Sequence, residues 1–259
     1  MDIIKLFDIS GKTALVTGGS SGIGYMIAEG LARAGAQVWI CSRKQADIDA
    51  AAARLSAFGT VRAFAADLST EAGIAQAAAS LGAAPLHILV NNAGATSGAS
   101  RAAFPRKGFE KVLNLNLLAP FALVQALLPA LKAAGTTEDP ARVINIASID
   151  GIKLPMWESY PYSATKAGLI HMTRHLGKFL APENVSVNAI APGFFASKMS
   201  ASALDLQDEA VLEEIASPLG HRMGTTEDMA GAVIYLSSRA GAWLSGVTLP
   251  VSGGYATID

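Results

Sequence analysis

Short, almost continuously apolar runs alternate along this chain with longer, alanine-rich runs. The candidate strands are TALVT (13–17), QVWICS (37–42), VRAFAA (61–66), HILVNN (87–92), RVINIA (142–147), VSVNAI (185–190) and GVTLPV (246–251). Strands without polar alternation are typical of parallel sheets that are covered on both faces. The other runs predict helices over residues 22–34, 45–57, 70–81, 107–133, 160–180 and 226–238. This order predicts right-handed βαβ crossovers, and therefore an α/β fold with a doubly wound parallel sheet.

The alternation of predicted strands and helices is not interrupted by an internal repeat, a low-complexity tract or a linker, so we expect one domain over residues 1–259. Residues 194–222 break it and are predicted to form a loop or short helices that cover the substrate as a lid. The most apolar segment, residues 117–131, is shorter than the roughly 20 residues of a membrane helix and contains Pro120 and Pro129. We expect it to be a buried or interface helix.

The composition limits the kinds of partner that this chain is expected to bind. Apolar residues make up 51% of the chain and charged residues 16%, which favours extensive burial, some of it between subunits. The 20 Lys+Arg and 21 Asp+Glu nearly cancel, so the charge indicates neither a nucleic acid nor an anionic membrane as partner. Cys41 is the only cysteine, and the N-terminal residues lack the apolar stretch of a secretory signal. These features predict a cytoplasmic protein.

The first predicted strand is followed by GGSSGIG, in which Gly18, Gly22 and Gly24 are spaced G-x3-G-x-G. Ligands of doubly wound sheets bind beyond the carboxyl ends of the strands. Glycine lets the backbone approach a ligand closely, and a helix that begins near Gly22 turns its free N–H groups toward this turn. A pyrophosphate is the natural occupant; a tight strand-to-helix turn without a ligand is the alternative.

The end of the second strand indicates which dinucleotide to expect. NAD-binding proteins place a carboxylate here for the ribose hydroxyls, but this chain has Ser42, Arg43 and Lys44. An arginine fork suits the 2′-phosphate of NADP, so we expect NADP(H) rather than NAD(H), although a solvated turn would have the same composition. Asp67 follows the third strand and could accept a hydrogen bond from adenine or cap the next helix.

The stretch YPYSATKAG (160–168) places a tyrosine and a lysine four residues apart, on one face of a predicted helix. Tyr162 has this partner in Lys166, whereas Tyr160 has none at that spacing. A nearby ammonium favours the phenolate and would lower the pKa of the tyrosine from about 10. Ser148, directly after the fifth strand, could add a hydroxyl donor. An ordinary packing pair is the alternative.

Five motifs occur together in the order and spacing of the short-chain dehydrogenase/reductases: TGGSSGIG (17–24), NNAG (91–94), the serine of INIAS (Ser148), YSATK (162–166) and APG (191–193). The chain resembles this family over essentially its whole length, and within it the RhlG-type β-ketoacyl reductases and the gluconate 5-dehydrogenases. The resemblance implies a Rossmann-like sheet of about seven strands. It also implies an NAD(P)-dependent oxidoreductase that interconverts a ketone and a secondary alcohol, assembled as a homotetramer, with a dimer as the alternative.

The resemblance implies roles for single residues as well. Tyr162 would donate the proton in reduction, Lys166 would lower the tyrosine pKa and hold the ribose hydroxyls, and Ser148 would orient the carbonyl. Asn116 matches the asparagine that kinks its helix and holds a water of the proton relay. Besides Tyr162 and Lys166, the implied cofactor contacts are Gly18, Ser20, Ser21, Gly22, Ile23, Gly24, Ser42, Arg43, Lys44, Asp67, Leu68, Asn92, Ala93, Gly94, Pro192, Gly193, Phe195 and Ser197.

Apolar residues near these motifs indicate the kind of substrate. The expected substrate contacts are Ser148, Tyr162, Met156, Trp157 and Phe194. Such a lining favours a hydrophobic ketone, above all a 3-oxoacyl compound. Asp150, Lys153 and Glu158 border the site and could bind a polar head group, which keeps sugar acids and polyols as alternative substrates.

Three observations complete the expectations. Ser21 stands where many NADP-dependent relatives have an arginine. His171 and His175 have a metal-like spacing but no third ligand, so we expect no metal. A non-catalytic nucleotide sensor on the same fold is the alternative from another functional class, and the presence of both Tyr162 and Lys166 argues against it.

Overall fold

The computed structural model describes residues 2–155, 157–197 and 215–257. Within these residues, seven strands form one parallel sheet in the order β3-β2-β1-β4-β5-β6-β7. The strands are β1 (Thr13–Thr17), β2 (Gln37–Ser42), β3 (Val61–Ala65), β4 (Ile88–Asn91), β5 (Ala141–Ile146), β6 (Val185–Pro192) and β7 (Thr248–Val251). The predicted doubly wound sheet is therefore confirmed, and each strand lies within two residues of its expected bounds.

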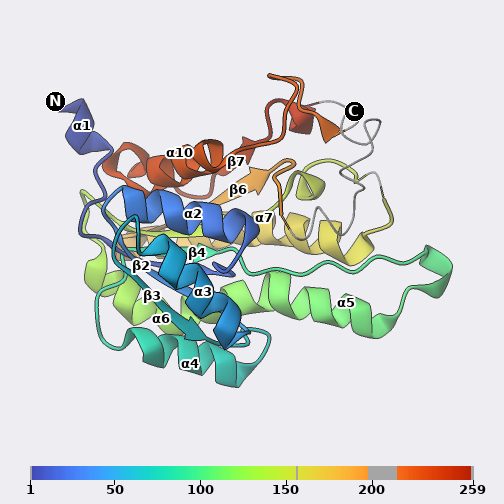
Figure 1. Ribbon diagram of the computed structural model, residues 1–259, viewed down its shortest axis with the longest axis horizontal. Helices are drawn as coiled ribbons and strands as arrows, with labels where there is room; N and C mark the ends of the chain where they lie inside the picture. The colour runs from blue at the N-terminus through green and yellow to red at the C-terminus, as the bar shows by residue number, and fades with distance from the viewer. Residues whose placement is uncertain (1, 156, 198–214, 258–259) are drawn as a thin grey trace.

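Helices cover both faces of the sheet (Figure 1). One face and its apolar core are shared by α2 (Gly22–Arg33), α3 (Gln45–Leu55) and α10 (Thr226–Ser237). The other face is covered by α4 (Glu71–Leu81), α6 (Ala119–Ala134) and α7 (Tyr160–Leu180). Two layers of helices explain why the strands lack polar alternation, since both of their faces are buried. A short N-terminal helix, α1 (Ile3–Leu6), was not expected from the sequence.

The single helix predicted over residues 107–133 is divided in two. α5 (Arg106–Leu113) leads into a π-helical turn, Asn114–Leu118, and α6 follows. In Figure 1, α5 projects away from the body of the molecule. By length and composition alone, the stretch Arg106–Ala134 could cross a membrane. Core helices pass the same test, and α6 buries one side against α4 and the sheet, as expected for a buried helix.

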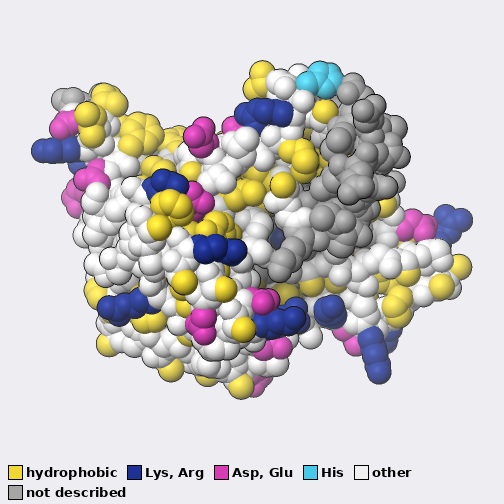
Figure 2. All heavy atoms as spheres, viewed as in Figure 1, with side chains coloured by type: hydrophobic (Ala, Val, Ile, Leu, Met, Phe, Trp, Pro, Cys, Tyr) yellow, Lys and Arg dark blue, Asp and Glu magenta, His cyan; other side chains and the backbone are white. Residues whose placement is uncertain are grey.

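Of the predicted lid over residues 194–222, residues 198–214 lie outside the described part of the chain, as does Met156. The flanking residues that are described come together, because Phe195 pairs with Gly224 in an isolated bridge. Charged side chains of both signs are scattered over the face seen in Figure 2, and apolar side chains gather over α1. Those apolar side chains are Ile3, Ile4 and Phe7.

A buried arginine lies at the amino edge of the sheet, opposite to the carboxyl ends of the strands. Arg142 of β5 is 1% exposed. Its guanidinium donates to the carbonyl oxygens of Leu236 and Ser238 at 3.1 and 3.0 Å, and to Asp139 Oδ1 at 2.8 Å. Two of these acceptors are carbonyls at the C-terminal end of α10, which a cation stabilises.

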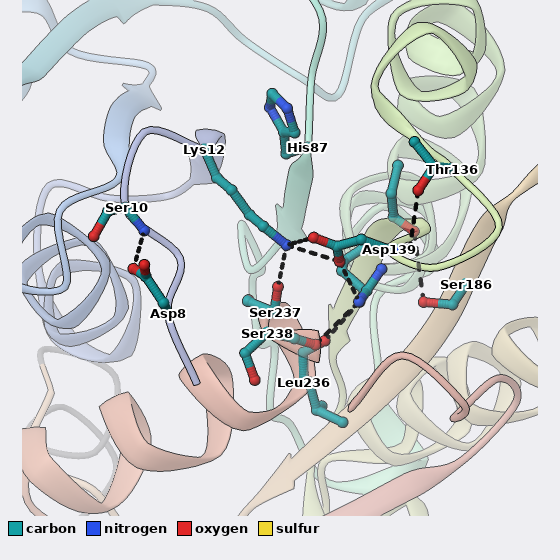
Figure 3. Close-up of polar contacts among 12 residues, drawn as sticks. Asp8, Ser10, Lys12, His87, Thr136, Asp139, Ser186, Leu236, Ser237 and Ser238 are labelled. Atoms are coloured by element: carbon teal, nitrogen blue, oxygen red, sulfur yellow. Dashed lines mark hydrogen bonds and ion pairs between the residues drawn. The ribbon is translucent and has the colours of Figure 1, made fainter. Parts of the chain in front are cut away.

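A lysine completes this arrangement (Figure 3). Lys12 Nζ lies 2.8 Å from Asp139 Oδ2 and donates to the Ser237 carbonyl at 3.1 Å. His87 lies beside them, and its Nδ1 accepts the Thr13 N–H at 3.1 Å. We call Lys12, His87, Asp139 and Arg142 the amino-edge cluster. It fastens α10 to the start of the strands and was not predicted from the sequence.

Candidate active site

A deep cleft lies where the strand order reverses, at the carboxyl ends of β1 and β4. It has a volume of about 430 Å³. A doubly wound sheet binds its ligands at this switch point, because the loops after the two strands diverge there. The predicted contacts that line the cleft are Gly18, Ser20, Ser21, Gly22, Ile23, Gly24, Ser42, Arg43, Leu68, Asn92, Ala93, Gly94, Ser148, Tyr162, Lys166, Pro192, Gly193 and Ser197.

The glycine turn after β1 requires glycine for two different reasons. Gly18 and Gly22 have positive φ angles of 68° and 56°, which other residues rarely adopt. At Gly24 a Cβ would collide with the Asn92 amide and with the Gly18 carbonyl. The turn therefore leads directly into the N-terminus of α2, whose N-cap, Ser21, makes no side-chain capping bond. The first N–H groups of the helix thus remain available to an anion.

Two residues tie this turn to the loop after β4. Thr17 Oγ1 accepts the N–H groups of Asn92 and Ala93, both at 2.9 Å. The Asn92 amide donates to the Thr17 carbonyl at 2.8 Å. Thr17 is a residue that the sequence analysis missed; its position as the last residue of β1 was the available signal. These bonds fix the distance between the two walls of the cleft.

The end of β2 supplies the other part of the cleft. Ser42 Oγ is buried there without a hydrogen-bond partner among the described atoms, and Arg43 also lines the cleft. Lys44 does not line it: this exposed residue is the N-cap of α3. Asp67 is exposed outside the cleft, where its carboxylate accepts bonds from the Ser69 N–H and hydroxyl at 3.1 and 2.7 Å. These bonds lower the pKa of Asp67, with a smaller effect from Arg43.

These features fit a dinucleotide. A glycine turn without room for Cβ atoms, an uncapped helix N-terminus and an unpaired buried hydroxyl beside an arginine are the donors that phosphate and ribose oxygens require. In the described part of the chain no cluster of three His, Cys, Asp or Glu could hold a metal ion. The ring of His175 instead contacts Phe179, with 5.1 Å between the centroids.

Ser148, Tyr162 and Lys166 meet at the inner end of the cleft. Ser148 follows β5, and its Oγ accepts the Asp150 N–H at 3.1 Å. Tyr162 and Lys166 lie one turn apart on α7, with Lys166 Nζ 5.5 Å from the centre of the tyrosine ring. Lys166 is 4% exposed and donates to the Ile146 carbonyl at 2.6 Å. The predicted hydroxyl, phenol and ammonium therefore share one wall of the cleft.

The pKa of Tyr162 moves in the direction opposite to the one expected from the sequence. Part of its surface opens into the cleft, but most of the side chain is surrounded by protein. This desolvation raises its pKa to about 12, while a hydrogen bond with Ser148 acts the other way. Desolvation also lowers the pKa of Lys166 to about 8. Burial is the largest effect on Tyr162, so this residue is a protonated phenol at neutral pH and can donate.

Asn116 lies in the π-helical turn and is 1% exposed. Its amide group spans the backbone of Ala95: Nδ2 donates to the carbonyl at 2.9 Å and Oδ1 accepts the N–H at 2.8 Å. Nδ2 also lies 3.3 Å from Thr165 Oγ1 on α7. The π turn, a feature often found at functional sites, thereby joins the loop after β4 to the helix that carries Tyr162.

The segment after β6 forms the far end of the cleft. Pro192, Gly193 and Ser197 line it as expected, but the side chain of Phe195 does not. Phe195 is 3% exposed and packs in the core between the sheet and α10, where its ring fills the space that a Cβ at Gly224 would occupy. The ring of Phe195 therefore points away from the cleft into an apolar site, and the expected cofactor contact of this residue stays a prediction that only its backbone could meet.

Aromatic residues lie beside the cleft. The ring of Phe194 contacts Trp157 and Tyr255 edge-on, with 6.2 and 5.0 Å between the centroids. Phe194 and Tyr255 also line a neighbouring cavity of about 290 Å³. Tyr160, by contrast, is exposed and donates its hydroxyl to Glu158 at 2.7 Å, away from the cleft.

Comparisons with known proteins agree with this geometry. The family model described as short chain dehydrogenase matches residues 12–208. A rhamnolipid-biosynthesis 3-oxoacyl-(acyl-carrier-protein) reductase of Pseudomonas aeruginosa is 44% identical over 251 residues, which cover 96% of this chain and 98% of the relative. A gluconate 5-dehydrogenase of Gluconobacter oxydans is 32% identical, with 96% of each chain covered.

Solved structures give the same answer. The Pseudomonas aeruginosa RhlG/NADP active-site complex superposes with a TM-score of 0.91 and 45% identity, covering 97% of this chain and 99% of that one. Fold, cleft and sequence likeness agree over nearly the whole length. The chain therefore belongs to the short-chain dehydrogenase/reductase family and is an oxidoreductase.

Proposed function

We propose that the protein is an NADPH-dependent reductase of a 3-oxoacyl thioester or another hydrophobic ketone. The observation that carries the proposal is the placement of the Tyr162 phenol beside the Ser148 hydroxyl and the Lys166 ammonium, in a cleft whose lining fits a dinucleotide; burial keeps the phenol protonated. A phenol in this state donates a proton to an oxygen that gains negative charge.

The residues divide the work as follows. The dinucleotide, when bound, supplies the hydride that adds to the carbonyl carbon. The Ser148 Oγ accepts the Asp150 N–H, which fixes its position, and its hydroxyl, which now bonds to Tyr162, can turn to donate to a bound carbonyl oxygen. Tyr162 then gives its proton to that oxygen, and takes it back in the reverse reaction. Lys166 donates one N–H group to the Ile146 carbonyl and has two more that can donate to ribose hydroxyls.

The preference for NADPH is argued from the end of β2. Arg43 lines the cleft beside the unpaired Ser42 hydroxyl, and no carboxylate occupies this position to favour the ribose hydroxyls of NAD. The Pseudomonas aeruginosa RhlG structure, which is similar to this chain, is a complex with NADP. Ser21 supplies no second cation, so the selectivity is assigned to Arg43 alone.

The hydrophobic substrate is argued from Phe194, Trp157 and Tyr255, which stack edge-on beside the cleft. The reductase of Pseudomonas aeruginosa that resembles this chain is named for a 3-oxoacyl substrate. A sugar acid is the second candidate, because Lys153 lies 4.9 Å from the Tyr255 ring centre and could pair with a carboxylate, and a gluconate 5-dehydrogenase is 32% identical.

The test is nicotinamide absorbance with purified protein and NADPH or NADH, against 3-oxoacyl thioesters, simple ketones and keto sugar acids. We expect the fastest oxidation of NADPH with the 3-oxoacyl thioesters. Faster turnover of the sugar acids would move the assignment to the second candidate. Binding of NADPH without turnover of any compound would contradict the reductase and favour a nucleotide sensor.

The assembly and the domain organisation complete the proposal. We infer one domain, because one continuous sheet runs through the described chain. We infer a homotetramer because α5, α6 and α7 and the π turn expose large apolar side chains: Phe109, Leu118, Phe121 and Phe179. Buried Cys41 fits a reducing cytoplasm. Sedimentation equilibrium tests the tetramer, and a monomeric mass would exclude it.

A further inference from the structure

The loop after β5 carries a carboxylate that the proposed reaction leaves without a role. Ser148 precedes a short 3₁₀ turn, Ile149–Gly151, and Asp150 lies at its centre. The Asp150 N–H already holds the Ser148 hydroxyl at 3.1 Å. The turn also packs tightly on α7, since a Cβ added at Gly151 would lie 2.7 Å from the carbonyl carbon of Lys166. The backbone thus fixes Asp150 against the two catalytic segments.

The charged groups that face the Asp150 carboxylate come from two elements. Lys166 on α7 and Lys153 in its own loop are near enough for their charges to act on it, and its charge acts on Tyr162 of α7. β6, which also packs on this turn, carries no charged residue. Asp150 and Lys153 line an open cavity of about 700 Å³ together with Ser163. Among the described residues, no carboxylate lies within ion-pair distance of Lys166, so Asp150 acts on it through space.

The negative charge of Asp150 acts in the same direction on both catalytic groups. Burial lowers the pKa of Lys166 to about 8, and Asp150 opposes that fall. Burial raises the pKa of Tyr162, the Ser148 hydrogen bond lowers it, and Asp150 raises it further. A charged lysine and a protonated phenol are both required for the site to donate a proton. Burial raises the pKa of Asp150 itself, and Lys166 and then Lys153 lower it again.

We propose that Asp150 is a positioning residue of this site, an anion that keeps Lys166 charged and Tyr162 protonated and so widens the pH range in which the site donates a proton. This inference rests on the proposed reductase function. The head-group contact expected from the sequence stays a prediction, since Asp150 and Lys153 also line the open cavity beside the cleft. The Ser148 bond uses the backbone N–H, so Asp150→Asn removes the charge and leaves that bond intact.

The first test is the pH dependence of kcat/KM for reduction. In Asp150→Asn we expect the alkaline limb to move to lower pH by about one unit, the lower end of what a neighbouring charge produces. Asp150→Glu keeps the charge and should stay near the wild-type limb. Asp49→Asn is the matched control, since this carboxylate lies far away on α3, where it pairs with Gln45. It should leave the profile unchanged.

The second test needs no turnover. The side-chain NMR signals of isotope-labelled lysine are titrated in the protein alone, and Lys166 is the signal missing in Lys166→Arg. We expect its midpoint to fall in Asp150→Asn together with the kinetic limb. An unshifted midpoint and limb, even with a lower kcat at all pH values, would assign Asp150 a purely structural role and overturn the proposal. A wild-type protein without turnover would instead contradict the reductase function, while the lysine titration still decides the role of Asp150.

Discussion

Lys12 at the amino edge of the sheet and Lys166 at its carboxyl edge are both largely buried, with different partners. Lys12 has the Asp139 carboxylate at 2.8 Å and the Ser237 carbonyl at 3.1 Å. Lys166 has the Ile146 carbonyl at 2.6 Å and, among the described residues, no carboxylate at ion-pair distance. Burial lowers the pKa of both lysines, to about 8 for Lys166; the direct bond with Asp139 counteracts burial at Lys12, and the charge of Asp150 does so through space at Lys166.

The difference shows what each edge is built for. At the amino edge, one carboxylate holds two cations, and these cations bind the last carbonyls of α10. The charged groups there all bind to segments that are far apart in the sequence. At the carboxyl edge, by contrast, several donors remain available to a ligand: two N–H groups of Lys166, the phenol of Tyr162 and the hydroxyl of Ser42. Changes at the first edge should therefore affect stability, and changes at the second should affect turnover.

Among the changes considered, Tyr162→Phe should show the largest difference between the effect on turnover and the effect on stability. Without the hydroxyl the site loses its proton donor, so kcat should fall about a thousandfold. The ring and its packing remain, so the affinity for NADPH and the free energy of unfolding should change little. Steady-state kinetics, calorimetric titration and urea unfolding measure the three quantities. Tyr160→Phe is the matched control, because the Tyr160 hydroxyl is exposed and bound to Glu158. Equal loss in both variants would contradict the assignment of the donor.

The converse change is Arg142→Leu at the amino edge. The variant takes the Arg142 donor away from the Leu236 carbonyl, leaves the Ser238 carbonyl with only the Gly241 N–H at 3.1 Å, and removes one cation from Asp139. Asp139 is 30% exposed and keeps Lys12, so the main loss is the buried carbonyl that has lost its donor, which costs about 1 to 3 kcal/mol, and we expect that loss in urea unfolding. Arg106→Leu is the control: its ion pair with Glu110 is exposed, and such pairs contribute about 0.5 kcal/mol or less. A folded Arg142→Leu protein with lost turnover but unchanged stability would contradict the assignment of stability to the amino edge and of turnover to the carboxyl edge.

The carboxyl edge could be predicted from the sequence because its residues form local motifs. The continuously apolar strands predicted a parallel sheet, and the residues that follow each strand were then predicted to line the cleft. The direction of Phe195 was beyond that reasoning, since only the packed structure shows which side of the segment offers an apolar site. The helical pattern of the sequence likewise shows no break at the π turn around Asn116, and only the family resemblance implied a kink there.

The amino edge was missed for a different reason. Lys12 and Asp139 are 127 positions apart, and the carbonyls at residues 236–238 come from a third segment. No local pattern connects them. One signal was present: Arg142 is the only charged residue of a strand that is buried throughout, and a buried arginine requires partners. The sequence could have predicted that such partners exist, but not which residues they are.

A third change sharpens the comparison within the carboxyl edge. Arg43→Asp should raise the Kd of NADPH by about ten- to a hundredfold, the value of one charge-assisted hydrogen bond, and change that of NADH much less. Lys44→Asp is the matched control, because Lys44 is the next residue along the chain but does not line the cleft. Calorimetric titrations with both dinucleotides decide this. Similar losses for the two variants would indicate a general field of positive charge, and similar losses of NADPH and NADH would contradict the 2′-phosphate contact.

The smallest effect is expected from protonation within the amino-edge cluster. Desolvation and the nearby charge of Lys12 lower the pKa of His87, although Asp139 acts the other way. The folded protein therefore binds a proton at His87 less readily than the unfolded chain. The resulting stability is present above the ordinary histidine pKa of about 6.5 and is lost as the pH falls through it toward the folded-state pKa.

His87→Asn tests this effect, because an amide oxygen can still accept the Thr13 N–H without taking up a proton. Urea midpoints are compared at about pH 7.5 and about pH 5.5, on either side of the ordinary histidine pKa. The wild-type protein should lose more stability on acidification than the variant, by less than about 1 kcal/mol, because solvent screens a half-exposed group. The other three histidines are present in both proteins and cancel in the difference. If both proteins lost the same stability on acidification, protonation of His87 would not destabilise this edge. A third positive charge beside the single carboxylate of Asp139 would then be tolerated.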